Sequence, residues 1–222
     1  MKPTIIIGDI HGLTYWKEVI KQNPDCRYIF MGDYLDPYTH VSYPELIGNL
    51  NDVIAFKEAH PDEVILLLGN HDMHYITEKM PPCSRYNYSI EKEVGDIFFS
   101  NRALFQYAFQ DGRYLFTHAG VTQPWFDDDF KGDIMRNIAD QLNHPANEEQ
   151  DLALYFCSHH RGGPNDNSGI FWTDIAEMER SPLKGFTQVV GHNRVRDILT
   201  RTANDGIVIF CDCLFNKKYL KL

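Results

Sequence analysis

The sequence lacks an apolar run long enough to cross a membrane. A membrane-spanning helix needs about 20 consecutive, mainly apolar residues, whereas the longest apolar runs of this chain have only the length of a strand. The first residues, 1–4, lead directly into such a run and lack the apolar stretch and cleavage site of a signal peptide. We therefore expect a soluble, cytoplasmic protein with no membrane partner.

Cysteine is scarce and scattered, and the chain contains Cys26, Cys83, Cys157, Cys211 and Cys213. An odd number of cysteines without regular spacing argues against a disulfide framework. Cys211 and Cys213 form the one close pair, and in a strand their side chains would face the same way. Buried thiols are the main interpretation of this pair, and a metal or redox site is the alternative.

Positive charge is also in short supply. The chain has 21 Lys and Arg against 31 Asp and Glu, which gives a formal net charge of −10. This balance disfavours non-specific binding to nucleic acid or to anionic lipid. It does not exclude a phosphorylated substrate, because bound divalent cations would invert the local field.

What the sequence does contain is enough apolar surface for a core. Of its 222 residues, 43% are hydrophobic, which suits one domain. In the first part, strand-like and helix-like segments alternate, and this order favours a largely parallel sheet. The expected strands cover residues 4–7, 28–31 and 64–68, and the expected helices cover residues 14–22 and 45–59.

The second part is less regular. A helix over residues 101–110 is predicted to lead into a strand over residues 114–117. Residues 121–169 are polar and interrupted by proline, so we expect a helical insert or cap there within a single domain over residues 1–222. Short helices are expected in it over residues 133–141 and 148–156, and closing strands over residues 187–190, 207–210 and 219–222.

Five of the expected strands end in the same way, in Asp, Asn or His beside glycine. The motifs are Gly8-Asp9-Ile10-His11-Gly12, Gly32-Asp33-Tyr34-Leu35-Asp36, Gly69-Asn70-His71-Asp72, His118-Ala119-Gly120 and Gly191-His192. If these strand ends meet at one edge of a sheet, they bring carboxylate, amide and imidazole groups together. Such donors suit Mn²⁺, Fe or Zn²⁺, and two metals about 3.5–4 Å apart are a common device for phosphoester hydrolysis.

As a set, these motifs resemble the calcineurin-like metallophosphoesterase superfamily. The chain is most similar to its phosphoprotein phosphatase (PPP-type) branch, which includes bacterial and phage Ser/Thr phosphatases and symmetrical diadenosine-tetraphosphate hydrolases. Residues 169–174 and 209–213 resemble the Trp-x-Asp stretch and the closing Ile-Asp strand of that branch. The resemblance implies an α/β fold of four layers (αββα), in which a β-sandwich of mixed sheets is flanked by helices.

The resemblance also implies roles for individual residues. Asp33 would bridge two divalent ions, with Mn²⁺ expected and Fe or Zn²⁺ as alternatives. In many superfamily members the last motif is Gly-His-x-His, but here it is Gly191-His192-Asn193-Arg194, and this departure favours the PPP-type arrangement over nucleases and cyclic-nucleotide phosphodiesterases. The implied metal ligands are Asp9, His11, Asp33, Asn70, His118 and His192.

The implied reaction is an in-line attack at phosphorus by a hydroxide held between the metals. His71 would protonate the leaving oxygen, and Asp36 would hold its imidazole charged and aligned. The phosphate would be held in part by Asn70. Many PPP-type enzymes also hold the phosphate with an arginine at the position of Pro37, so this chain needs a replacement, for which Arg161 is the first candidate, with Arg194 and Arg85 behind it.

Three functions remain open at this point. The first is a two-metal phosphomonoesterase that acts on phosphoproteins or small phosphate esters. The second is a hydrolase of dinucleoside polyphosphates or other nucleotides, because Pro37 and the insert would reshape the substrate cleft. The third is a catalytically silent binding module. The retained ligands and His71 argue against this last interpretation, and the sequence leaves the oligomeric state open.

Overall fold

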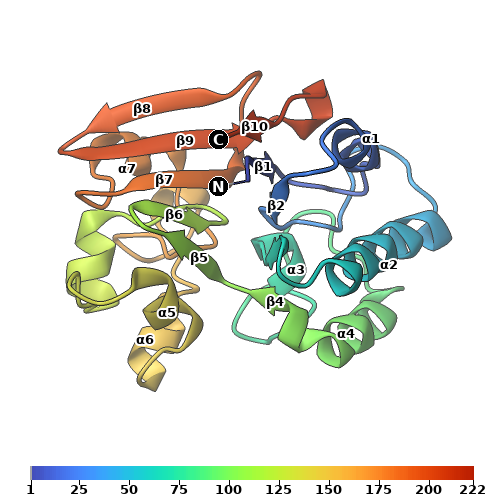
Figure 1. Ribbon diagram of the computed structural model, residues 1–222. Coiled ribbons are helices and arrows are strands. Elements are labelled where there is room, and N and C mark those ends of the chain that lie inside the picture. Colours follow the sequence, from blue (N-terminus) through green and yellow to red (C-terminus); the bar gives the residue numbers. More distant parts are fainter. Residues whose placement is uncertain (1) are drawn as a thin grey trace.

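The computed structural model describes residues 2–222 and contains two five-stranded sheets (Figure 1). Their strand orders are β10-β1-β2-β3-β4 and β5-β6-β7-β9-β8. The strands are β1 (Thr4–Ile7), β2 (Arg27–Phe30), β3 (Val64–Leu67), β4 (Phe105–Gln106), β5 (Ala108–Asp111), β6 (Tyr114–Thr117), β7 (Thr187–Arg194), β8 (Leu199–Ala203), β9 (Gly206–Asp212) and β10 (Leu220–Lys221). In the first sheet β1 to β4 are parallel, and β10 runs antiparallel to β1.

The helices lie mainly outside these sheets (Figure 1). They are α1 (Tyr15–Gln22), α2 (Tyr43–Ala59), α3 (Asn70–Met73), α4 (Glu91–Ser100), α5 (Ile138–Asn143), α6 (Glu148–Ala153) and α7 (Ile175–Arg180). Four further turns are η1 (Arg102–Leu104), the π-helical η2 (Trp125–Asp129), η3 (His159–Arg161) and η4 (Leu214–Asn216). None of the helices within residues 2–222 has the length and apolar character that a membrane span requires.

The two sheets pack face to face through alternate residues of their strands. Side chains on β1 point to opposite faces in turn, so Ile6 faces the second sheet while Ile5 and Ile7 face the helices. The core between the sheets contains Ile6, Ile29, Met31, Leu67, Phe116, Val189, Ile209 and Cys211. The strands of the first sheet are therefore buried on both faces, which explains their continuous apolar runs.

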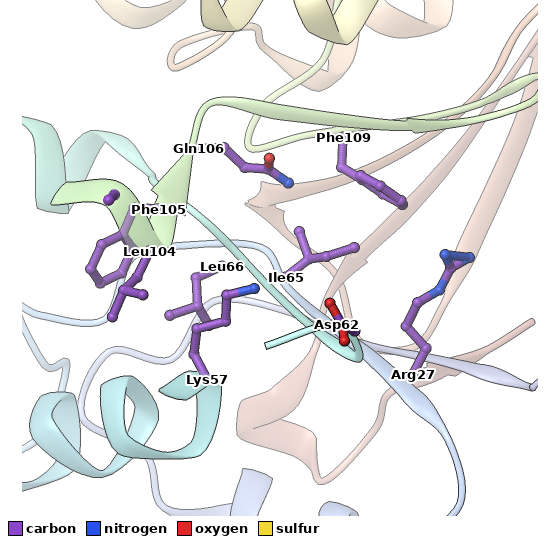
Figure 2. Close-up of a pocket in the computed structure, with 10 residues that line it drawn as sticks. Arg27, Lys57, Asp62, Ile65, Leu66, Leu104, Phe105, Gln106 and Phe109 are labelled. Carbon is purple, nitrogen blue, oxygen red and sulfur yellow. The ribbon is translucent and has the colours of Figure 1, made fainter. Parts of the chain in front are cut away.

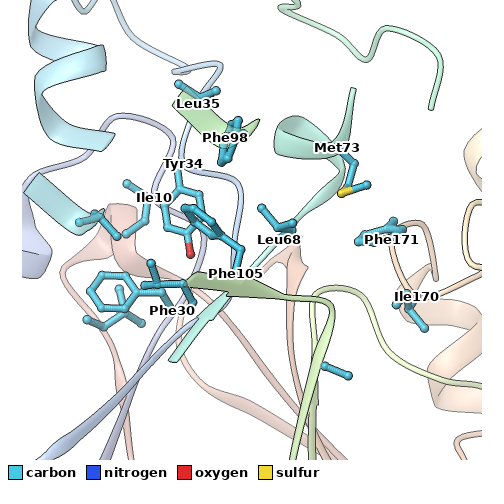
Figure 3. Packing of buried hydrophobic residues seen from close by; sticks show 14 of the residues in the cluster. Ile10, Phe30, Tyr34, Leu35, Leu68, Met73, Phe98, Phe105, Ile170 and Phe171 are labelled. Carbon is cyan, nitrogen blue, oxygen red and sulfur yellow. The ribbon is translucent and has the colours of Figure 1, made fainter. Parts of the chain in front are cut away.

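Helices cover the outer face of each sheet. On the first sheet, Trp16 of α1 lies edge-on to Phe30, with 5.6 Å between the ring centroids. In the same core, Phe105 contacts both Tyr34 and Phe98 (Figure 3). On the second sheet, α7 packs Met178 against Val190, Val208 and Phe210. This arrangement is the expected four-layer sandwich of mixed sheets.

The predicted helix over residues 101–110 is wrong. The helix of this region is α4, which ends at Ser100, and it is followed by η1 and by the strands β4 and β5. Phe105 packs between two aromatic rings, and β4 and β5 pair with the edges of β3 and β6. Tertiary pairing at two sheet edges therefore outweighs the local pattern. The sequence pattern also missed α4, α7 and β8, whereas α5 and α6 occupy parts of the two short helices expected at residues 133–141 and 148–156.

Candidate metal centre and active site

The residues predicted as metal ligands come from two sheets. Asp9, Asp33 and Asn70 follow the strands β1, β2 and β3 of the first sheet, whereas His118 follows β6 and His192 lies near the end of β7 in the second. The expectation of one sheet edge is therefore too simple. The segments that carry these residues meet because the carboxyl ends of the parallel strands in the two facing sheets point the same way.

Asp33 lies at the centre of the six predicted ligands. Its Oδ2 is 3.5 Å from Nε2 of His11 and 3.5 Å from Nε2 of His118. Two groups that could each hold a metal ion share it, namely Asp9, His11 and Asp33, and Asp33, His118 and His192. Asn70 joins the second group, because its Oδ1 lies 3.0 Å from His118 Nε2 and 3.0 Å from His192 Nδ1.

Three of these residues have unusual backbone conformations. His11, Asp33 and His192 have φ angles of 41°, 52° and 59°, in the left-handed region that side-chain-bearing residues seldom occupy. Such conformations persist only where the surrounding structure enforces them, and they concentrate at functional sites. At His11 and Asp33 the chain has just left β1 and β2, and at His192 the register of β7 against β9 shifts, so all three donors stand where regular strand geometry is interrupted.

The candidate histidine ligands are buried, and their surroundings favour the neutral imidazole. Nδ1 of His11 donates to the carbonyl oxygen of Leu35 at 2.7 Å, and Nδ1 of His118 donates to that of Met31 at 2.8 Å. Burial lowers the pKa of both His11 and His118 to about 3, which leaves each Nε2 with a free lone pair. Nε2 of His192 is buried without a hydrogen-bond partner among the described residues. These are the features of imidazoles prepared to bind a metal.

The carboxylates of the site repel one another. Burial raises the pKa of Asp9, and the charge of Asp212 raises it further. Burial likewise raises the pKa of Asp33, with the charge of Asp72 adding to the effect. For buried acids beside neutral imidazoles the ionised form is disfavoured without a counter-charge, which divalent cations would supply. The residues therefore fit a pair of divalent ions.

Asp72 is a buried residue that stands in one of the sequence motifs but was assigned no role there. Its carboxylate accepts backbone N–H bonds from Gly69 at 2.8 Å, Asp33 at 2.7 Å and Tyr34 at 2.8 Å. It thereby ties the loop after β2 to the loop after β3. The signal was its place in the motif Gly69-Asn70-His71-Asp72, but only the fold shows what it binds.

His71 and Asp36 meet beside the ligands. His71 Nδ1 is 2.7 Å from Asp36 Oδ2, and the hydroxyl of Tyr75 donates to Asp36 Oδ1 at 2.7 Å. Burial alone would raise the pKa of Asp36, but the hydrogen bond from His71 and the imidazole of His74, whose Nε2 lies 2.8 Å from Asp36 Oδ2, hold it below its ordinary value. Burial also lowers the pKa of His71 and outweighs the opposite effect of Asp36. Asp36 therefore holds the imidazole in one orientation, with Nδ1 toward the carboxylate.

The three candidate arginines have different surroundings. Arg161 forms an ion pair with Asp174, with 2.8 Å between Nε and Oδ2, and also donates to Asn193. Arg194 stacks on the rings of Tyr38 and Phe215. Arg85 has the direct contact, because its Nη2 lies 3.4 Å from His71 Nε2 and its Nε donates to the carbonyl oxygen of Asp36 at 2.9 Å. Arg85 is therefore bonded to the backbone of Asp36, directly before Pro37.

A cavity of about 250 Å³ lies elsewhere, between β3, β4 and the end of α2 (Figure 2). Its two basic residues are already engaged. Lys57 Nζ donates to the carbonyl oxygens of Pro61 and Val64 at 2.6 and 2.7 Å, and Arg27 pairs with Asp111. None of the predicted ligands lines this cavity, so it offers no competing reaction centre.

Close packing at Gly191 gives a testable prediction. A Cβ atom at Gly191 would overlap the carboxylate of Asp9, whereas one at Gly48, inside α2, would meet no atom within 4 Å. We expect Gly191→Ala to weaken metal binding about 10- to 100-fold, the range typical of disturbed ligand support. Gly48→Ala is the control and should stabilise the fold by about 0.5–1 kcal/mol. Calorimetric metal titration of both variants provides the measurement, and equal affinities would contradict the packing argument.

The family model described as calcineurin-like phosphoesterase matches residues 2–208 of the chain. A curated relative, a catalytic subunit of protein phosphatase 2A from Dictyostelium discoideum, is 34% identical over 80 residues, which are 34% of this chain and 24% of the relative. The similarity thus spans about a quarter of that relative's length.

Solved structures show the same fold. A protein serine/threonine phosphatase from Saccharomyces cerevisiae with similarity to human PP5 superposes with a TM-score of 0.56 at 15% identity, covering 95% of this chain and 67% of that one. A cold-active protein-tyrosine phosphatase from a psychrophilic Shewanella gives a TM-score of 0.58 at 15% identity, covering 98% of this chain and 72% of that one.

Proposed function

The chain belongs to the calcineurin-like phosphoesterase family, and we propose that it is a two-metal phosphatase that hydrolyses phosphomonoesters, with serine/threonine phosphoproteins as the expected substrates. The observation that carries the proposal is the position of Asp33, which is shared by two groups of metal-binding side chains. A shared carboxylate is what a pair of closely spaced cations requires.

Asp9, His11 and Asp33 would hold one ion, and Asp33, Asn70, His118 and His192 would hold the other. When bound, such ions lower the pKa of water and neutralise charge on the phosphate oxygens. Manganese is the expected metal, with iron or zinc as the alternatives, because the site combines carboxylate, amide and imidazole donors without thiolate.

The protein's own contribution to the reaction centres on His71. Its Nδ1 is tied to Asp36, so its Nε2 is the atom that faces the site and would deliver a proton to the leaving oxygen. Arg85 lies against the same Nε2 and would grip a phosphate oxygen, which would replace the arginine that Pro37 excludes. Asn70 and Arg161 would contact the same phosphate from the side of the second metal ion.

Phosphotyrosine is included among the test substrates because a protein-tyrosine phosphatase shares this fold, and diadenosine tetraphosphate is included because a nucleotide hydrolase is the alternative function. Protein stripped with a chelator should hydrolyse 4-nitrophenyl phosphate only after Mn²⁺, Fe²⁺ or Zn²⁺ is restored. Phosphoserine, phosphothreonine and phosphotyrosine peptides and diadenosine tetraphosphate are then assayed in parallel. Preference for the phosphoserine or phosphothreonine peptides supports the proposal, preference for diadenosine tetraphosphate replaces it by the nucleotide hydrolase, and metal binding without any turnover favours the silent binding module.

A further inference from the structure

A second pocket adjoins the candidate metal centre and is separate from His71. It encloses about 280 Å³, and its walls include Asp9 and His11 on one side and Tyr38, Arg194 and Phe215 on the other. The ring of Tyr38 stands edge-on to His11, with 4.9 Å between the centroids. The pocket therefore begins where the first group of metal ligands ends.

Arg194 is fixed in this pocket by stacking. Its guanidinium carbon lies 4.2 Å from the ring centroid of Tyr38 and 3.9 Å from that of Phe215. Within residues 2–222 the Arg194 side chain forms no hydrogen bond and no ion pair. Its cross-strand neighbour Asp212 also lines the pocket, and although the positive charge of Arg194 acts on Asp212, the two side chains form no ion pair. Because stacking occupies the flat faces of the guanidinium, the N–H groups around its edge are free to bind an anion.

We propose that this pocket binds a second anionic group of the substrate, a phosphate or a carboxylate, beside the phosphate that is hydrolysed. This inference rests on the proposed function and narrows its substrate class. Arg85 serves the reacting phosphate because it contacts His71, whereas Arg194 opens onto the neighbouring pocket, which His71 does not line among the described residues. Tyr38, which is 51% exposed, stacks with both guanidinium groups and links the two positions.

The test compares ligands that differ in one anion. Binding of propane-1,3-bisphosphonate and propylphosphonate is measured by calorimetry, with and without Mn²⁺. In parallel, kcat/KM is measured for phosphoserine peptides with glutamate or glutamine beside the phosphoserine. We expect the second anion to improve binding or kcat/KM about 10- to 100-fold, as one charge-assisted hydrogen-bonded contact provides.

The variants locate the effect. In Arg194→Gln the preference for the second anion should fall close to one, and in Arg194→Lys, which keeps the charge but loses the planar fork, it should be intermediate. Arg201→Gln is the matched control, because Arg201 pairs with Glu179 on the surface and should keep the full preference. A response to the bisphosphonate alone identifies a phosphate, and a response to the peptide alone identifies a carboxylate.

Two results would overturn the inference: no preference in the wild-type protein, or an undiminished preference in Arg194→Gln. For the bisphosphonate, both can be read from binding alone. Absence of metal-dependent hydrolysis would count against the proposed function, and the binding ratio would still decide the role of Arg194.

Discussion

Replacing His71 by alanine is expected to reduce the turnover of an alkyl phosphate about 10²- to 10⁴-fold, the usual contribution of a general acid. The fall for 4-nitrophenyl phosphate should be smaller, because nitrophenolate departs without needing a proton. Metal binding should persist, since the contact between this residue and Asp33 is made by the backbone N–H of His71 to Asp33 Oδ1, at 2.8 Å. The measurement is kcat for both esters together with metal content.

Two further variants make this result specific. Asp36→Asn should reproduce part of the loss, because the carboxylate bonded to His71 Nδ1 fixes which ring nitrogen faces the site. His144→Ala should change nothing, because the His144 side chain is 78% exposed and lies outside the candidate site. An equal loss on both esters in His71→Ala would assign the residue a structural role, and an undiminished rate would remove it from the mechanism.

Asp33→Asn is expected to change stability in opposite directions with and without metal. In metal-free protein, burial and the neighbouring charge of Asp72 both disfavour the ionised form of Asp33 and raise its pKa. A neutral amide removes that penalty, so the metal-free variant should melt at the same temperature as the wild type or higher. Turnover should fall by at least about 10²-fold, because the shared ligand of both ions is weakened.

The metal response should disappear in the same variant. At a metal concentration about 100 times the Kd, binding stabilises a protein by about 2.7 kcal/mol, which for a domain of this size is about 5–10 °C in Tm. We expect such a shift for the wild type with Mn²⁺ and little or none for Asp33→Asn. Thermal scans with and without Mn²⁺ provide the measurement. A full metal shift in the variant would show that Asp33 does not bind both ions.

The candidate metal ligands could be predicted from the sequence because their signal is local. Each motif places Asp, Asn or His beside glycine directly after an apolar strand, and both the strand and the turn depend on neighbouring residues. The family resemblance added the four-layer order, which the two packed sheets confirm. The predicted boundaries of the buried strands agree closely with the observed ones, because a continuous apolar run marks where such a strand begins and ends.

The prediction of a helix over residues 101–110 was wrong because the conformation of this segment depends on strands that are distant in the sequence. Phe105 pairs with Leu66, and Phe109 pairs with Phe116, so the segment bridges the edges of both sheets. Neither edge is visible in the segment itself. The sequence assigned no role to Asp72 for a similar reason. Its carboxylate accepts hydrogen bonds from three backbone N–H groups of two separate loops, and these loops meet only in the fold.

The sequence by itself predicted which residues would carry the chemistry, showed their order along the chain and indicated the class of site. The tertiary structure decided the surroundings of His71, because the burial that lowers its pKa and its contacts with Asp36 and Arg85 cannot be read from a motif. It also decided that Arg85 lies nearest His71 and that Arg194 opens onto a pocket of its own. Side chains far apart in sequence meet only when the two sheets pack, so their distances and burial are properties of the fold.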